Sequence, residues 1–163
     1  MPEGRIVVVN TTPILSLAMI RQLGLLRDLY TEVFIPPAVR AEIQAGGSDA
    51  MGVRDIEEAF WVRTMELKDP RRAELLSDLD RGEAEVIALS QEIGAHAVVI
   101  DEKLARAHAR RLGLPLTGTL GVLLKAKKAG RLPLLRPLIE QLIGGGVWIS
   151  PALVAESLKL AGE

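Results

Sequence analysis

Short apolar runs rich in β-branched residues alternate along the chain with longer segments whose apolar residues recur every three or four positions. The strand-like runs are residues 5–9, 33–35, 97–100 and 116–117, with a weaker alternation at 61–67. Helical spacing covers the segments between and after them: 14–20, 25–30, 38–44, 51–59, 83–93, 102–112, 120–129, 134–143 and 151–160. Runs that are apolar on both faces are typical of buried parallel strands. Strands that alternate with helices indicate an α/β fold with a central, mainly parallel sheet.

Glycine and proline residues separate these segments and mark their ends. Residues 80–82 are expected to form a turn, and the glycines at 144–146 a turn or hinge. The triple glycine is not a phosphate loop, because no lysine followed by serine or threonine comes after it. With 163 residues, the chain is long enough for one hydrophobic core. We expect one domain over residues 1–145, and an extension over 146–163, with a short strand at 147–149 and a helix, that packs on it.

Composition excludes several classes of protein. Hydrophobic residues make up 48% of the chain, so intrinsic disorder is excluded. No apolar run approaches the roughly 18 to 20 residues that span a bilayer. The first residues lack the basic region and cleavage site of a signal peptide, and there is no cysteine. We therefore expect a cytoplasmic domain without a membrane partner.

The small net charge of −1 conceals an asymmetry between the two parts of the chain. Residues 1–100 carry 10 basic and 16 acidic side chains, whereas residues 101–163 carry 10 and 5. A local basic face suits a polyanion such as RNA, although ordinary solvated helix faces would give the same pattern. The candidate RNA-binding residues are Lys103, Arg106, Arg110, Lys125, Lys127 and Lys128.

Two buried strands end in polar residues, Asn10 and Asp101. The carboxyl ends of parallel strands share one edge of the sheet, where ligands and catalytic groups collect. If the two strands are neighbours, these side chains can approach within the distance that a bridging metal spans. The alternative is that each residue caps the helix that follows it, since Asn and Asp are favoured N-caps.

Two glutamates are further candidates. Glu83 opens a helix, where the dipole favours a carboxylate, but it shares a helical face with Val86 and Ile87. A carboxylate on a partly buried face is costly unless it is paired or bound to metal. Glu42 lies near the end of a helix, where the dipole disfavours it, so it is either incidental surface or retained for function.

These candidates are all oxygen donors, and oxygen donors select Mg²⁺ or Mn²⁺ over Zn²⁺. A divalent ion held by carboxylates beside a basic face suits phosphodiester hydrolysis, because the ion activates water and stabilises charge at phosphorus. His96 and His108 are expected to be structural or exposed.

Five segments in order resemble the PIN domain family of metal-dependent ribonucleases, and more narrowly the PIN-like proteins often found as toxins of prokaryotic toxin–antitoxin pairs. The segments are residues 7–15, 35–43, 82–89, 99–102 and 117–123. The resemblance implies a three-layer α/β/α sandwich. It also implies single-stranded RNA as substrate and an antitoxin protein as partner. The apolar residues of the helices expected over 134–143 and 151–160 would either cover the sheet or form a homodimer contact.

The resemblance also implies roles for individual residues. Asp101 and Glu83 would bind the metal, Glu42 would be a third catalytic carboxylate, and Thr12 and Thr119 would support the site. The departure is Asn10, which stands where the family usually has its principal metal-binding aspartate. Asparagine offers a carbonyl oxygen but removes one negative charge, which weakens metal binding. The alternative function is therefore a catalytically weakened module that binds RNA or a protein partner without turnover.

Overall fold

The central sheet of the protein has five parallel strands. A computed structural model describes residues 4–46 and 52–163. The strands are β1 (Ile6–Val9), β2 (Glu32–Ile35), β3 (Val62–Thr64), β4 (Ala97–Val99) and β5 (Leu116–Thr117), in the order β3-β2-β1-β4-β5. All four pairings are parallel. The prediction of an α/β fold with a parallel sheet is confirmed.

Helices connect the strands and extend beyond the last of them. They are α1 (Thr11–Met19), α2 (Gly24–Leu29), α3 (Pro37–Ala45), α4 (Val53–Glu58), α5 (Arg71–Glu74), α6 (Arg81–Ile93), α7 (Lys103–Arg111), α8 (Thr119–Lys128), α9 (Arg136–Gly144) and α10 (Pro151–Leu160). The helix predicted over 51–59 corresponds to α4, and its residue 51 lies outside the described residues.

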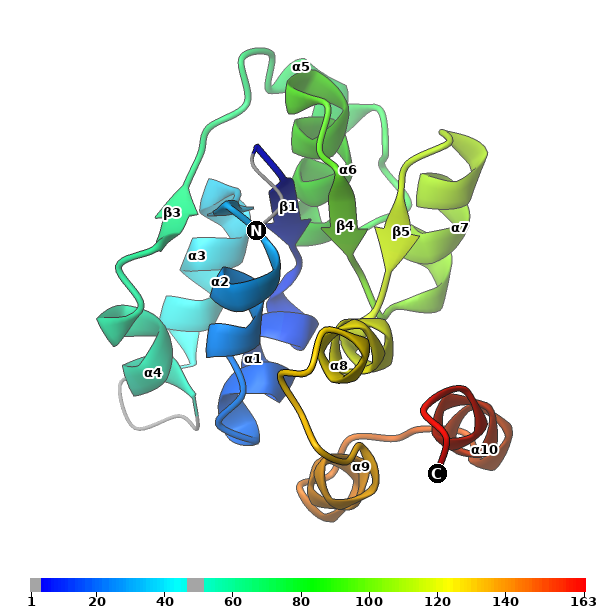
Figure 1. Cartoon of the computed structure of the whole chain (residues 1–163). Coiled ribbons are helices and arrows are strands. Elements are labelled where there is room, and N and C mark those ends of the chain that lie inside the picture. The colour runs from blue at the N-terminus through cyan, green and yellow to red at the C-terminus, as the bar shows by residue number, and fades with distance from the viewer. Residues whose placement is uncertain (1–3, 47–51) are drawn as a thin grey trace.

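The helices flank the sheet as in a three-layer sandwich (Figure 1). α6 contacts β1 and β4, and α7 contacts β5, whereas α2 contacts β2 and packs with α8. Figure 1 also shows α9 and α10 set apart from this body, beyond α8, near the end of the sheet toward which the strand arrows point. The three-layer arrangement agrees with the fold that the PIN resemblance implied.

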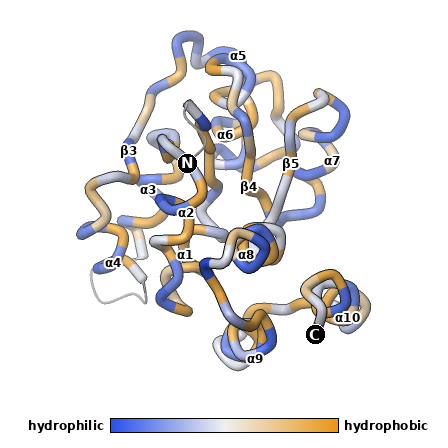
Figure 2. The backbone as a smooth tube through the Cα atoms, in the orientation of Figure 1, coloured by the Kyte–Doolittle hydropathy of each residue, from blue (hydrophilic) through white to orange (hydrophobic). Residues whose placement is uncertain are grey.

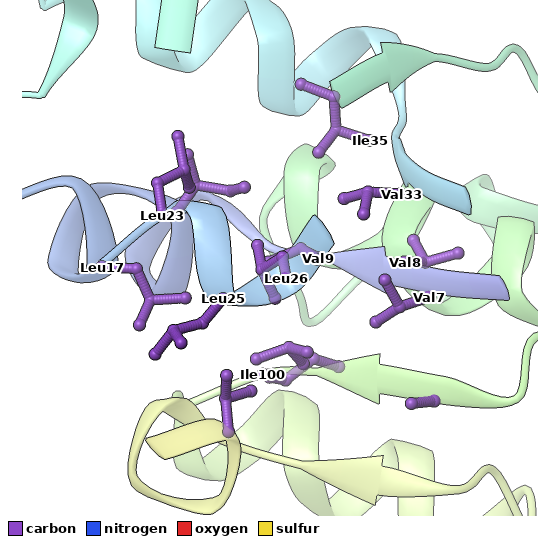
Figure 3. Packing of buried hydrophobic residues seen from close by; sticks show 14 of the residues in the cluster. Val7, Val8, Val9, Leu17, Leu23, Leu25, Leu26, Val33, Ile35 and Ile100 are labelled. Carbon is purple, nitrogen blue, oxygen red and sulfur yellow. The ribbon is translucent and has the colours of Figure 1, made fainter. Parts of the chain in front are cut away.

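β1 is the centre of the core. Val7, Val8 and Val9 are fully buried, because β1 lies between β2 and β4 and helices cover both faces. Figure 3 shows their side chains among those of neighbouring elements, including Leu26 and Ile100. This burial explains why the strand is β-branched at every position and carries no polar residue before its end.

Three local predictions are corrected. The expected turn at residues 80–82 is the start of α6, because the Asp80 side chain accepts a hydrogen bond from the Glu83 backbone and caps the helix. Helix α1 begins at Thr11, three residues before the expected start at residue 14, and Asn10, with extended backbone, occupies its N-cap position. Residues 147–149 form no strand, since they lie outside the five-stranded sheet and have no neighbouring strand with which to pair.

The end of α10 is tied to α8 and α9 by the Glu163 carboxylate. It lies 2.9 Å from Lys127 Nζ of α8 and accepts hydrogen bonds from the backbone amides of Leu135 and Arg136, at the start of α9. Figure 2 shows hydrophilic and hydrophobic residues alternating around α9 and α10.

The domain boundary that we expected at residue 145 stays a prediction. Over residues 4–46 and 52–163, no helix has the length and apolar character needed to cross a membrane.

Candidate functional site

β1 and β4 are neighbours, so their polar ends meet at one edge of the sheet. Val9 pairs with Val99, and the backbone amide of Asn10 donates a 3.0 Å hydrogen bond to the Val99 carbonyl. The Asn10 residue is only 4% exposed. Although Asn10 stands at the N-cap position of α1, its side chain accepts no hydrogen bond from the first turn of that helix. Helix capping therefore does not account for the asparagine side chain.

Asp101 is held by α8, and not by the helix that follows it. Its carboxylate accepts a 2.8 Å hydrogen bond from the Thr119 amide and a short one from the Thr119 hydroxyl. The cap of α7 is Glu102, whose side chain accepts from the Ala105 amide. The interpretation of Asp101 as an N-cap of the following helix is therefore wrong. The predicted pair Asp101 and Thr119 does come together.

Gly118 lets this contact form. A Cβ atom at Gly118 would lie 2.7 Å from Asp101 Oδ1 and 3.1 Å from a guanidinium nitrogen of Arg106. That guanidinium donates hydrogen bonds of 2.6 and 3.1 Å to the carbonyls of Ile100 and Thr117, at the ends of β4 and β5. Arg106 is half-buried and links the two strand ends. Its guanidinium, which we predicted to bind RNA, therefore already has partners within the protein.

Glu83 lies at the start of α6 and is 7% exposed. It forms a capping box with Asp80: the Glu83 amide donates to Asp80 over 2.7 Å, and the Asp80 amide donates to Glu83 Oε1 over 3.1 Å. The pKa of the Glu83 carboxyl is raised to about 7, mainly by burial and also by the negative charges of Asp80 and Glu102, whereas the hydrogen bond from the Asp80 backbone acts in the opposite direction. The capping role and the burial inferred from the helical face are both present.

Glu102 is a site residue that the sequence reasoning missed. Its carboxylate shares a hydrogen bond with Glu83, and that bond contributes, after the backbone amides of α7, to lowering the pKa of Glu102. Because a carboxylate has no hydrogen to donate, the contact requires a proton, which the raised pKa of Glu83 supplies. The adjacent pair Asp101 and Glu102 at a strand end was the available signal, but only Asp101 was selected from it.

Glu42 approaches the same corner from α3. Its Oε2 accepts a 2.9 Å hydrogen bond from the Thr11 hydroxyl. A Cβ atom at Gly82 would collide with Glu42 Oε1, so a larger residue there would displace the Glu42 carboxylate. Glu42 thus lies over the residue before Glu83. Thr11, which holds it, was not predicted; the predicted Thr12 instead lines a pocket with Asp101 and Thr119.

The candidate metal ligands suit a divalent ion in chemistry more than in arrangement. All candidate groups are oxygen donors, which fits Mg²⁺ or Mn²⁺. Within residues 4–46 and 52–163, however, no three Asp, Glu or His side chains converge on one point. The edge provides a close pair, Glu83 with Glu102, beside Asp101 and the Asn10 amide. The chemistry fits the ion, and the geometry supplies a pair of carboxylates in place of a complete cage.

The predicted RNA-binding cations divide into two groups. Lys125 lies over the Tyr30 ring at 4.6 Å, and Lys127 donates to the Ala161 carbonyl and to Glu163. These two lysines and Arg106 are half-buried, and each has an interaction partner within the protein. The exposed ones are Lys103, Arg110 and Lys128. Both histidines have structural contacts, with His96 Nδ1 accepting from the Ile6 amide and His108 lying 2.8 Å from Asp78.

Comparison with known families agrees with the fold. A family described as a PIN domain matches residues 6–163. The chain therefore belongs to the PIN domain family, and it has the nuclease-like fold of that family. The comparison with curated proteins finds no significant match.

Proposed function

We propose that the chain is a divalent-metal-dependent ribonuclease that hydrolyses phosphodiester bonds of single-stranded RNA. The observation that carries the proposal is the buried Glu83 carboxylate beside Glu102, at the edge where the strands end in Asn10 and Asp101. Two carboxylates this close repel each other unless a proton or a cation neutralises them. In the part of the chain that the structure describes, no lysine or arginine forms an ion pair with either of them.

The residues of this edge would have different roles in metal binding, positioning and proton transfer. The close pair Glu83 and Glu102 would hold Mg²⁺ or Mn²⁺, with Asp101 and the neutral carbonyl oxygen of Asn10 at the adjoining strand ends. When bound, the ion would lower the pKa of a water molecule and stabilise the charge that develops on the phosphate. Thr119 fixes the Asp101 carboxylate, and the Thr11 hydroxyl fixes Glu42. Glu42 would accept a proton from the attacking water.

The test is cleavage of a pool of single-stranded RNA with saturating Mn²⁺, and with EDTA as the metal-free control. We expect cleavage only with Mn²⁺, and a reduction of about 10-fold or more in Glu102→Gln, since loss of a group that supports a metal typically lowers activity 10–100-fold. Glu140→Gln, an exposed glutamate of α9, is the matched control and should cleave as wild type. Absence of cleavage at saturating Mn²⁺ would reject the enzyme.

Asn10 favours a second function, RNA binding without turnover. A buried neutral amide at the central strand end supplies less charge for the metal than a carboxylate would. This function is supported if RNA binds in a salt-sensitive manner, is not cleaved, and becomes a substrate in Asn10→Asp.

A toxin role and an antitoxin protein are the finer consequences of the family resemblance, and a homodimer is the expectation from the apolar C-terminal helices. We propose them as expectations of the same function. Growth arrest on expression that requires Asp101 would support the toxin role, and light scattering would measure the oligomeric state.

A further inference from the structure

A pocket of about 490 Å³ lies directly beside the acidic edge. Its polar wall includes three predicted site residues: Thr12 of α1, Asp101 after β4, and Thr119 of α8. Its other wall is mainly apolar and comes from Leu120, Leu142 and the segment 146–153. The pocket therefore joins the candidate metal-binding edge to the C-terminal segment, which has no role in the proposed chemistry so far.

Trp148 is the most unusual residue of that segment. It lines the pocket and is 83% exposed, in contrast to the usual partial burial of tryptophan. The backbone around it is anchored on both sides. Val147 donates a 3.0 Å hydrogen bond to the Leu142 carbonyl, and the Ser150 hydroxyl caps α10 by accepting from the Leu153 amide. The indole is thus held at the pocket by an ordered segment of chain.

The turn after α9 also contacts α1, and this contact fixes the same segment. A Cβ atom at Gly145 would lie 2.5 Å from the Met19 sulfur, so the turn after α9 packs closely on α1. Helix α1 begins at the end of β1, next to Asn10. The position of the tryptophan is therefore tied to the strand end that forms the candidate site.

We propose that this pocket receives an unpaired nucleobase of the RNA strand, with Trp148 as its stacking partner, while the adjoining phosphodiester lies at the acidic edge. The inference rests on the proposed function and names its substrate subsite. A volume of about 490 Å³ lies in the range of pockets for small ligands, roughly 300–1,000 Å³. A helix or folded partner would need an interface of about 1,000 Å² or more, which a pocket of this size does not offer.

The chemistry of the walls also fits a base. Tryptophan stacks on any nucleobase, because every base has a π-face, whereas the hydroxyls of Thr12 and Ser150 can form hydrogen bonds with base edges. The carboxylate of Asp101 in the polar wall disfavours an acidic peptide. A base within a duplex stays in its stack, so such a pocket explains a preference for single strands.

The experiment measures binding without turnover. Fluorescence anisotropy with Mn²⁺, in a Glu42→Gln background to slow cleavage, compares a labelled ten-nucleotide oligoadenylate with an abasic strand of the same length. We expect Trp148→Ala to weaken binding of the oligoadenylate by about 10-fold and to leave the abasic strand unchanged, with Trp148→Phe retaining most of the affinity. The matched control is Phe60→Ala, an aromatic residue that is 77% exposed, between α4 and β3.

Any other result would contradict the proposed base-binding subsite. Equal loss on both strands would mean that Trp148 contacts the backbone, and wild-type affinity in Trp148→Ala, or no binding by the wild type, would mean that the pocket holds no base. The enzyme proposal fails separately, when Mn²⁺ gives no cleavage although the effect of Trp148 on binding remains. Circular dichroism would verify that the variants fold, as expected for an exposed side chain.

Discussion

The ends of β1 and β4 lie side by side, yet they differ in charge, burial and support. Asn10 is neutral, 4% exposed, and bound to Val99 through its backbone. Asp101 is charged and exposed, and its carboxylate is fixed by two hydrogen bonds from Thr119. The two strands have nearly the same apolar sequence and the same pairing. Because Val9 pairs with Val99, Asn10 stands opposite Ile100, and Asp101 lies one residue further along the chain, at the rim of the sheet.

This difference shows where the sheet edge tolerates negative charge. A carboxylate at the rim is solvated and receives hydrogen bonds. A carboxylate at the buried end would lose its solvation. An amide at position 10 avoids this penalty, at the expense of one charge for a bound cation.

The largest expected effect comes from removing the charge at the rim. We expect Asp101→Asn to lower Mn²⁺-dependent RNA cleavage by about 100-fold or more. The amide oxygen can still accept from the Thr119 backbone, so the free energy of unfolding should fall by only about 1 kcal/mol. Initial cleavage rates and urea denaturation measure the two effects. An unfolded variant, or one with wild-type activity, would contradict the assignment.

The reverse change adds a charge at the buried end. We expect Asn10→Asp to lower the free energy of unfolding by about 2 kcal/mol without metal, because a buried carboxylate lacks a cation partner. Saturating Mn²⁺ should reverse the loss and should raise cleavage about 10-fold above wild type. Urea denaturation with and without Mn²⁺ measures the coupling. Equal destabilisation in both conditions would show that position 10 does not face the ion.

The support of Asp101 through α8 predicts a separate pH effect. Helix α8 is held at its first turn by Asp101 and near its last residue by the contact of Lys127 with Glu163. The hydrogen bonds from the Leu135 and Arg136 amides, together with Lys127, lower the pKa of the Glu163 carboxyl to about 2, below its ordinary value of 4.5. This stabilisation is therefore complete above about pH 4.5 and is lost as the pH falls toward 2.

Glu163→Gln should consequently unfold at lower urea than wild type at pH 7, and the difference should shrink in acid. Glu156→Gln, an exposed position on α10, the helix that precedes Glu163, is the matched control and should unfold like wild type at both pH values. A difference between Glu163→Gln and wild type that does not depend on pH would contradict the ionised contact. The cleavage rate of the folded variant should stay near that of wild type, because Asp101 holds the other end of α8.

Much of the fold was predictable because burial dictates residue type. The fully apolar runs at β1 and β4 predicted central strands, and the polar residues after them predicted a common edge. Contacts between distant elements were less accessible. Glu102 was read as the first residue of a helix, and its contact with Glu83 depends on how α6 and α7 pack. Gly82 and Gly118 gave no periodic signal, although carboxylates lie against both of them.

The basic residues show the same limit. Their number in residues 101–163 was visible, but a sequence does not tell which cations face inward. Arg106 binds carbonyls and Lys127 binds Glu163, so both have structural partners that only the fold reveals. A Lys127→Glu variant would disturb packing as well as charge, which makes it a poor test of RNA binding.

The smallest expected effect concerns a cation at the rim. Lys103 is the exposed first residue of α7, two positions after Asp101, and a phosphate near the edge would lie within its reach. We expect Lys103→Ala to weaken single-stranded RNA binding by about 2- to 5-fold at low salt, and to reduce the salt dependence by about one phosphate contact. Lys159→Ala, an exposed lysine of α10, is the matched control. Titrations at several salt concentrations measure both slopes, and identical slopes for Lys103→Ala and wild type would place the RNA backbone away from the charged strand end.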